Sequence, residues 1–239
     1  MAKISVAIAV YNGEKYLAEQ LDSILAQLEK EDEIVVSYDK STDNSLDVIN
    51  KYCENDSRVR VVMNNNAGVT GNFSNAIANC KNEYIFICDQ DDIWAENKRD
   101  KVVADFTVHG ADMVIHNGVH INGEGKVISE PFFSMYRIGN GKLKNIIKPR
   151  YSGCCTAFTA DMAKKILPIP PKTDAYDHWV GTVGEFMGEI FYEEKVLLYH
   201  RLHGDNVTPE KRRSLSVIIK ARTHLLYCLA KRIKREKRG

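Results

Sequence analysis

Residues 84–94 read YIFICDQDDIW, an apolar run followed by three carboxylates within four positions. Five apolar residues in succession (84–88) are typical of a strand buried on both faces of a parallel sheet. Asp89, Gln90, Asp91 and Asp92 open the turn at its carboxyl end, where open α/β sheets bind their ligands. This stretch therefore predicts a parallel sheet and identifies the edge of the sheet that carries the chemistry.

Strands and helices alternate around this stretch through residue 116. We expect further strands at 4–10, 33–38, 59–63 and 113–116, and helices at 14–28, 43–53, 70–80 and 94–108. Within the first helix the apolar residues recur three and four positions apart, the spacing of a single buried stripe. The alternation predicts an α/β protein with a Rossmann-like, mostly parallel sheet flanked by helices. Residues 117–209 are less periodic, and we expect short strands and loops that complete the sheet and cover its cleft.

Composition narrows the class of protein. With 44% hydrophobic and 27% charged residues among 239, the chain has the balance of a soluble globular protein. Six cysteines without a CxxC pair, two of them adjacent, fit neither a disulfide framework nor a zinc site, so we expect reduced thiols. The amino end shows no secretory signature, and there is no run of about 18 apolar residues that could span a membrane. We therefore expect a cytoplasmic protein whose membrane contact, if any, is peripheral at the inner face of the plasma membrane.

The charge is unevenly distributed along the chain. Residues 210–239 hold eleven Lys or Arg against two Glu, a surplus of nine that leaves minus eight on residues 1–209. Between residues 214 and 235 the apolar residues share one helical face and the basic residues lie largely elsewhere. A basic amphipathic helix can lie in an anionic membrane surface, while packing on its own domain and a dimer contact are the alternatives. Nucleic-acid binding is not expected, because the basic residues are confined to this tail and no known module accompanies them.

The carboxylates of residues 89–92 have two explanations. Like charges crowded at a strand end repel one another unless a cation or hydrogen bonds compensate. Mg²⁺ is held by one or two carboxylates together with substrate phosphates, which predicts a diphosphate ligand. The alternative is helix capping, since Asp is favoured at helix amino ends. The motifs elsewhere in the chain bear on this choice.

Five motifs occur in the order expected of one family. SVAIAVYNGEKYLAEQLDSIL (5–25), VVSYDKSTDNSL (35–46), YIFICDQDDIW (84–94), AYDHW (175–179) and YHRLHGDNV (199–207) together resemble glycosyltransferase family 2, and DQDDIW most resembles its bacterial rhamnosyltransferase-like branch. The resemblance spans residues 3 to about 207 and implies a GT-A fold, inverting transfer from a nucleoside-diphosphate sugar, and Mn²⁺ or Mg²⁺ as cofactor. It implies one domain at 1–209, with a nucleotide-sugar-binding half (1–116) and an acceptor-binding half (117–209), followed by an amphipathic helical tail at 210–239.

The resemblance assigns the donor site residue by residue. Asp39 matches the acid that hydrogen-bonds the nucleotide base, although the family writes two acids and a Gly where this chain has Tyr38, Asp39 and Lys40. The family's basic residue before Asn72 is replaced here by Gly71, so a contact to phosphate or sugar is missing. The implied donor-binding residues are Ala9, Tyr11, Asn12, Asp39, Gly68, Asn72, Asp89, Gln90 and Arg201.

The same resemblance assigns the metal, the base and the acceptor side. Asp91 is the implied direct metal ligand, with Asp89 and His203 as further ligands and Asp92 as a helix cap. A neutral imidazole suits Mn²⁺, as the neighbouring Arg201 suits phosphate. Inverting transfer needs one base near the acceptor hydroxyl. Asp177 is the implied base, with Asp174 as the competing carboxylate and helix capping as the alternative for both. The implied acceptor residues are Gly153, Thr156 and Trp179.

These features predict a metal-dependent glycosyltransferase that moves a sugar from dTDP-rhamnose or a UDP-hexose to a saccharide or lipid-linked saccharide, in bacterial surface polysaccharide synthesis. A dinucleotide oxidoreductase would need a Gly-rich fingerprint after the first strand, where Tyr11-Asn12-Gly13-Glu14 is found instead. The alternative is an inactive nucleotide-sugar-binding scaffold at the membrane. An oligomer is compatible with the sequence.

Overall fold

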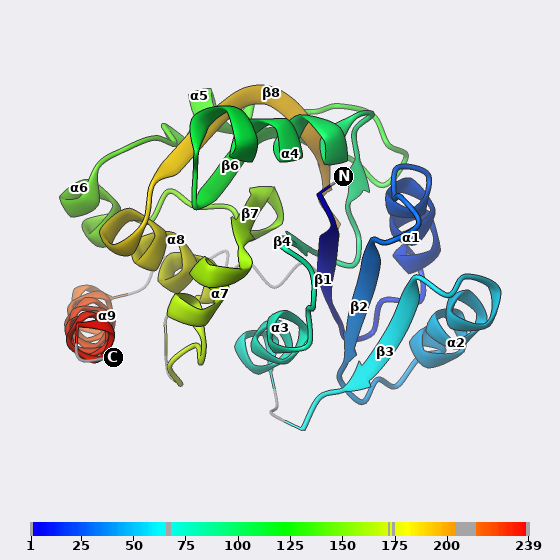
Figure 1. Ribbon diagram of the computed structural model, residues 1–239, viewed down its shortest axis with the longest axis horizontal. Coiled ribbons are helices and arrows are strands. Elements are labelled where there is room, and N and C mark those ends of the chain that lie inside the picture. Colours follow the sequence, from blue (N-terminus) through cyan, green and yellow to red (C-terminus); the bar gives the residue numbers. More distant parts are fainter. Residues whose placement is uncertain (1, 66–67, 172, 174, 204–213, 238–239) are drawn as a thin grey trace.

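A single sheet runs through the molecule, and the computed structural model describes residues 2–65, 68–171, 173, 175–203 and 214–237. The strand order is β3-β2-β1-β4-β7-β6-β8-β5, and helices pack around the sheet (Figure 1). Four of the seven strand pairs among these residues are parallel. The predicted α/β class, with a mostly parallel sheet flanked by helices, is confirmed.

The amino-terminal half forms four parallel strands with the predicted bounds. They are β1 (Ile4–Val10), β2 (Glu33–Tyr38), β3 (Val59–Met63) and β4 (Tyr84–Cys88). In β1, Val6 and Ile8 belong to one core cluster and Ala7 to the other, because successive side chains of a strand point to opposite faces. The strand is almost fully buried, which explains its continuously apolar sequence.

Helices of this half cover both faces of the sheet. α1 (Leu17–Leu25), α2 (Ser45–Asn55) and α4 (Lys98–His109) contribute to the first cluster, and α3 (Val69–Ala78) contributes to the second. The predicted helix start at Trp94 is wrong, because Trp94 lies in β5 (Ile93–Trp94) and its indole packs on Phe86 with ring centroids 5.5 Å apart. Local periodicity could not show this, since Trp94 pairs with Leu198 far along the chain.

The second half inserts an antiparallel strand into the sheet. β7 (Thr156–Thr159) lies between β4 and β6 (Met113–Ile121) and is antiparallel to both. β8 (Ile190–Arg201) runs parallel to β6 and ends beside β5, next to the carboxylates. β6 is longer than predicted and crosses the expected division at residue 116. Four short helical segments occupy stretches expected to be loops: α5 (Phe132–Tyr136), α6 (Lys142–Ile147), η1 (Gly153–Cys155) and α7 (Ala160–Ile166).

The carboxy-terminal helix α9 (Leu215–Glu236) packs on its own domain, beside α8 (Tyr176–Met187). Leu225 and Leu229 are buried in the second core cluster. Arg232 donates to the carbonyls of Leu167 (2.8 Å) and Pro168 (2.7 Å), which fastens the helix to the end of α7. None of the described helices is long and apolar enough to cross a membrane. The expected boundary at residues 209–210 lies outside the described residues.

Candidate functional site

The carboxyl ends of β1 and β4 meet where the strand order reverses. The chain proceeds outward from β1 to β2 and β3 and returns to β4 on the other side of β1, an arrangement that forms a binding crevice in open α/β sheets. Gln90 bridges the two ends, because the Tyr11 N–H donates to its Oε1 (2.9 Å) and its Nε2 donates to the Tyr11 carbonyl (3.0 Å). A Cβ on Gly13 would lie 2.5 Å from that Oε1. Gln90 therefore braces the crevice, and its contact with a donor stays a prediction.

The loop after β2 is fastened to the loop after β1. Asn12, at φ 50°, accepts a hydrogen bond from the Thr42 N–H through its Oδ1 (2.8 Å). At the end of β2, Asn64 Nδ2 donates to Asp39 Oδ1 (2.6 Å), and Asp39 is half-buried. The side chain predicted to read the nucleotide base is therefore oriented by a neighbour before any ligand binds.

α3 and β1 form the adjoining wall. Asn72 is buried in α3, and its Nδ2 donates to the Val10 carbonyl (3.0 Å). Its Oδ1 has no hydrogen-bond partner among the described residues. Ala9 pairs with Ser37 across β1 and β2, and Gly68 precedes α3 at φ 91°, a conformation that favours glycine. Contact of these residues with a donor stays a prediction.

Asp91 and His203, the predicted metal ligands, are in direct contact. His203 Nε2 lies 2.7 Å from Asp91 Oδ2, and the His203 ring packs beside Tyr16 with centroids 4.9 Å apart. The fold brings the two residues together although 112 positions separate them. Burial, followed by the charge of Asp92, raises the pKa of Asp91. One ion could therefore reach both side chains.

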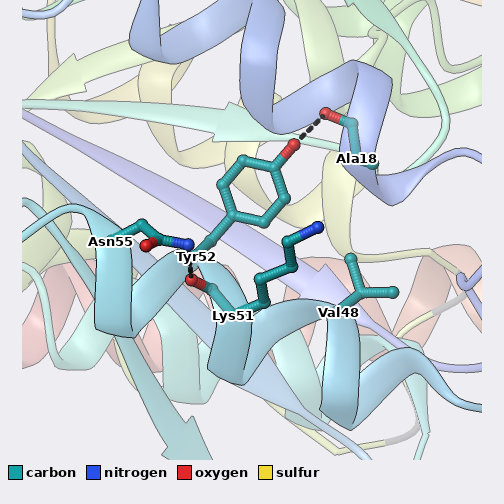
Figure 2. A pocket seen from close by; sticks show the side chains of 5 residues that line it. All are labelled: Ala18, Val48, Lys51, Tyr52 and Asn55. Carbon is teal, nitrogen blue, oxygen red and sulfur yellow. Dashed lines mark hydrogen bonds between the residues drawn. The ribbon is translucent and has the colours of Figure 1, made fainter.

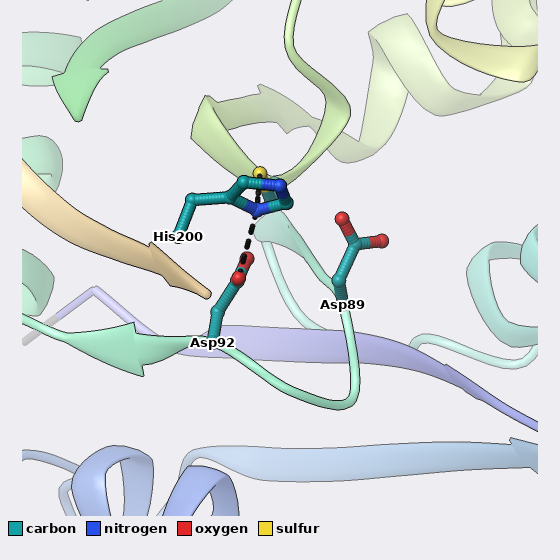
Figure 3. Close-up of side chains that lie close together, drawn as sticks. Asp89, Asp92 and His200 are labelled. Atoms are coloured by element: carbon teal, nitrogen blue, oxygen red, sulfur yellow. Dashed lines mark hydrogen bonds and ion pairs between the residues drawn. The ribbon is translucent and has the colours of Figure 1, made fainter. Parts of the chain in front are cut away.

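Asp89 and Asp92 belong to a second group, which includes Cys154 and His200 (Figure 3). Their candidate ligand atoms all lie within 4.8 Å of one another. His200 Nδ1 lies 2.8 Å from Asp92 Oδ1, and the same oxygen accepts the Arg201 N–H (3.2 Å). The prediction that Asp92 caps a helix is wrong. α4 begins after Asn97, and Asp92 turns instead toward the end of β8.

Crowded charges perturb this part of the site. Burial, followed by the charges of Asp92 and Asp91, raises the pKa of Asp89 to about 8. Burial alone would lower the pKa of His200, but the carboxylates of Asp92, Asp89 and Asp91, with Asp92 foremost, together outweigh it and raise that pKa to about 10. At neutral pH Asp89 therefore retains a proton, which a divalent cation would replace. Asp91 and His203 are thus a contacting pair that fits a divalent cation, while Asp89 lies in the neighbouring group of ligand atoms and its share in the same ion stays a prediction.

Asp177 lies in the first turn of α8, within electrostatic reach of Asp89. Its Oδ1 accepts the His178 N–H (2.7 Å), and burial raises its pKa to about 6. Tyr176, the residue before Asp177, donates its hydroxyl to Asp89 Oδ1 (3.5 Å), and its ring stacks on Phe73 with centroids 4.0 Å apart. A carboxylate with a pKa near the working pH is suited to general-base catalysis. The competing carboxylate at 174 lies outside the described residues.

Arg201 does not face an open phosphate site, which corrects its predicted role. The side chain is almost fully buried, and the guanidinium donates to Glu19 (2.7 Å) and to the carbonyls of Asp91 (3.2 Å) and Gly123 (3.1 Å). It also lies over the Tyr16 ring, 4.8 Å from the centroid. Arg201 therefore holds the turn that presents the predicted metal ligands.

The predicted acceptor residues are covered by other parts of the chain. Trp179 is fully buried and its indole N–H donates to a main-chain carbonyl of α7 (2.8 Å), so the prediction that it contacts acceptor is wrong. Thr156 is buried, and its hydroxyl donates to the Ser152 carbonyl (2.9 Å). A Cβ on Gly153 would lie 2.0 Å from the Tyr176 hydroxyl oxygen. Gly153 therefore leaves the space in which Tyr176 sits beside the carboxylates.

His200 and Cys154 are site residues that the sequence did not reveal. His200 is the third residue before His203, and a second His at the same strand end was the available signal. Cys154 looked like a small packing residue, and only the fold places its sulfur 3.9 Å from His200 Nδ1.

A separate hollow lies between α1 and α2 (Figure 2). It measures about 220 Å³ and is lined by Ala18, Val48, Lys51, Tyr52 and Asn55. The Tyr52 hydroxyl donates to the Ala18 carbonyl (3.1 Å). Its lining holds no carboxylate or imidazole, so this hollow is not the candidate site.

Known proteins resemble this chain in sequence and in fold. The family model for glycosyl transferase family 2 matches residues 5–167. An uncharacterised glycosyltransferase of Nostoc sp. is 30% identical over 212 residues, which cover 85% of this chain and 66% of that protein. Among solved structures, S. aureus TarS in complex with UDP-GlcNAc has a TM-score of 0.75 at 20% identity, covering 97% of this chain and 66% of that chain.

A mannosyltransferase of Pyrobaculum calidifontis in complex with GDP-Man and Mn²⁺ has a TM-score of 0.63 at 17% identity, covering 85% of this chain and 58% of that chain. The chain spans about two thirds of the length of the Nostoc relative and a smaller share of other curated relatives. At these identities the solved structures establish the likeness of the fold.

Proposed function

Because this chain belongs to glycosyl transferase family 2 and has the GT-A fold, we propose that it transfers a sugar from a nucleoside-diphosphate donor to a hydroxyl group of a saccharide or lipid-linked saccharide, with inversion. The observation that carries this proposal is a convergence at one edge of the sheet. Asp39 follows β2, Asp91 lies in the turn after β4, His203 follows β8 and Asp177 lies in the first turn of α8. Asp91 and His203 are in contact at 2.7 Å, Asp177 is within electrostatic reach of Asp89, and Asp39 stands at the carboxyl end of a strand that neighbours β1. Asp39 would supply base recognition, the Asp91–His203 pair cation binding and Asp177 a proton acceptor.

Asp39 supports a donor with a uracil or thymine base. The ring N–H of either base can donate to a carboxylate, whereas cytosine has no ring N–H at that position. TarS is seen with UDP-GlcNAc and the mannosyltransferase with GDP-Man. Guanine also carries a ring N–H, so the preference for UDP-hexoses and dTDP-rhamnose rests on the rhamnosyltransferase-like DQDDIW motif and on the UDP-GlcNAc complex of TarS.

Asp91, His203 and Asp89 would hold the divalent cation. When bound, the cation would offset charge on the departing diphosphate. Arg201 fixes the main chain of Asp91 and Tyr16 packs against His203, so side chains from distant segments are oriented in advance. This advance ordering reduces the entropy that is lost when the donor binds.

Asp177 would take the proton of the acceptor hydroxyl as its oxygen attacks the anomeric carbon. Its raised pKa makes it a better proton acceptor than an exposed Asp, while it still ionises below neutral pH. Tyr176 and Gly153 determine where this carboxylate stands relative to Asp89.

α9 supports peripheral attachment to an anionic membrane. Its inner side is used by the domain, but Leu215 (77% exposed), Ile219 (62%) and Leu226 (43%) point outward, and exposed lysines lie on the same helix. Apolar residues with flanking lysines are typical of interfacial helices. Full-length protein should float with phosphatidylserine vesicles. Ile219→Glu should weaken flotation more than the control Thr223→Glu, which is also exposed on α9.

A thermal-shift titration tests the donor site. UDP, dTDP, GDP, CMP and NAD are each added with Mn²⁺ or with EDTA, because a ligand that binds only the folded state raises the melting temperature. UDP or dTDP should stabilise the protein only with Mn²⁺. Asp91→Asn should remove the effect, and Asp47→Asn, exposed in α2, should keep it. Stabilisation by NAD alone would contradict the proposal.

The inactive scaffold differs from the enzyme in turnover. Incubation with Mn²⁺ and a UDP- or dTDP-sugar should release nucleoside diphosphate, and Asp177→Asn should not release it. A protein that binds nucleotide in the thermal shift but turns over none of the donors would be a scaffold.

A further inference from the structure

We propose that Asp89, Asp92, Cys154 and His200 form a second metal site, which takes Zn²⁺ or a similar thiophilic divalent ion. The four ligand atoms lie within 4.8 Å of one another and come from the turn after β4, from η1 and from the end of β8 (Figure 3). The thiolate sulfur of Cys154 favours Zn²⁺, whereas Mg²⁺ and Mn²⁺ favour oxygen ligands. This ligand set therefore differs in chemistry from the Asp91–His203 pair.

The spacing of the ligand atoms is close to what Zn²⁺ requires. With Zn–ligand bonds of about 2.0–2.3 Å, neighbouring ligands of a tetrahedral ion lie roughly 3.3–3.8 Å apart. His200 Nδ1 lies 2.8 Å from Asp92 Oδ1 and 3.9 Å from Cys154 Sγ. Small side-chain rotations would open the first distance and shorten the second.

Asp92 provides an independent sign of a ligand. Its side chain is fully buried, and Oδ1 receives both of its described partners, His200 Nδ1 and the Arg201 N–H. Oδ2 is buried without a hydrogen-bond partner among the described residues. Buried polar atoms are normally satisfied. A metal ion within the group would satisfy this oxygen.

Metal binding would have two chemical consequences. The Cys154 thiol, the His200 imidazolium and the protonated Asp89 must each release a proton to solvent, so binding strengthens with pH. The ion would also hold Asp89, which belongs to the donor set of the proposed catalytic cation. Zn²⁺ should therefore inhibit sugar transfer, and this consequence alone rests on the proposed function.

Cobalt spectroscopy tests the site without any sugar transfer. Co²⁺ replaces Zn²⁺ in tetrahedral sites, and a thiolate ligand produces a near-ultraviolet sulfur-to-cobalt charge-transfer band. Metal-free protein titrated with Co²⁺ should show this band, and one equivalent of Zn²⁺ should abolish it. Excess Mg²⁺ should leave it in place.

Variants identify the ligands. Cys154→Ser should lose the band, and His200→Gln should bind Co²⁺ more weakly by at least the roughly 10–100-fold that loss of an outer-shell partner costs. Cys155→Ser is the matched control, because Cys155 is the neighbouring thiol outside the four ligands, where it packs toward Gly118 and interacts with His116 as well as with Cys154. His203→Gln controls for the catalytic cation. Both controls should keep the band.

Three results would overturn the proposal: Co²⁺ binding without the band, a band that persists in Cys154→Ser, or a band lost in His203→Gln. Circular dichroism establishes whether each variant is folded, and His200→Gln decides the outcome if Cys154→Ser is not. A protein that shows the band but transfers no sugar would refute the proposed function and leave this site intact.

Discussion

Replacing Gly153 by alanine tests how the site seats Tyr176 beside its carboxylates. The new methyl group would lie 2.0 Å from the Tyr176 hydroxyl oxygen, 2.5 Å from Cζ and 2.8 Å from Cε2. Unstrained carbon contacts are about 3.5–4.0 Å, so the ring must retreat by more than about 1 Å. The ring cannot move back freely, because its face stacks on the Phe73 ring with ring centroids 4.0 Å apart.

The cost can be worked out from this clash. Overpacking a well-filled site costs roughly 1–3 kcal/mol. In a protein of this size each kcal/mol lowers the melting temperature by about 2–4 °C, so the expected loss is roughly 2–12 °C. Tyr176 precedes Asp177 and lies 3.5 Å from Asp89, so both carboxyl groups shift with it. A misplacement of about 1 Å can cost on the order of 100-fold in rate, and we expect kcat to fall by about 10- to 100-fold.

Thermal melts and turnover of Gly153→Ala are compared with those of Gly123→Ala. At Gly123 the nearest atom to a new Cβ is the Tyr16 hydroxyl at 3.9 Å, an ordinary contact, so its stability should stay within about 0.5 kcal/mol. In a Tyr176→Ala background the Gly153→Ala penalty should disappear, because the clashing ring is gone. A wild-type melting temperature for Gly153→Ala, or an equal penalty in both backgrounds, would refute the reasoning.

Three further predictions follow from the site. Asp177→Asn should abolish transfer yet stabilise the protein at pH 7. Burial raises the carboxyl pKa from 3.8 to about 6 and so penalises the ionised form. At about 1.36 kcal/mol per pKa unit, the variant should gain up to roughly 3 kcal/mol. In the wild type the penalty on the ionised carboxylate is absent below pH 3.8 and complete once the pH has risen through about 6. The melting temperatures of wild type and variant should therefore converge in acid. Wild-type turnover should rise through about pH 6. Arg201→Met should lower the free energy of unfolding by at least about 2–3 kcal/mol, since the guanidinium hydrogen bonds are lost. Urea unfolding measures this loss of stability, and a Mn²⁺ titration of turnover should show weaker activation by the cation. Gln90→Leu removes two hydrogen bonds to Tyr11 of about 1 kcal/mol each; steady-state kinetics should show a higher donor KM, and an unchanged KM would contradict the bracing role.

The sequence alone determined the elements whose signals are local. The bounds of β1, β2, β3 and β4 follow from short apolar runs, and the polar residues after them identify the functional edge of the sheet. In a parallel sheet all carboxyl ends of neighbouring strands share one edge, so the position of a motif after a strand already indicates where it lies. Asp39 and Asp91 could therefore be placed at this edge before any contact was known, whereas Asp177 was named only through the resemblance of residues 175–179 to the family motif.

Only the tertiary structure decided which side chains meet. Asp92 turns to His200 instead of capping α4, and Trp94 pairs with β8 instead of beginning a helix. Arg201, expected to bind the donor phosphate, is buried and donates to the Asp91 carbonyl. Each of these contacts joins segments far apart in the chain, and local periodicity carries no information about such partners. At a strand end one step along the chain also reverses the direction of a side chain. Neighbouring carboxylates such as Asp91 and Asp92 can therefore face different partners, and only the packed fold determines which.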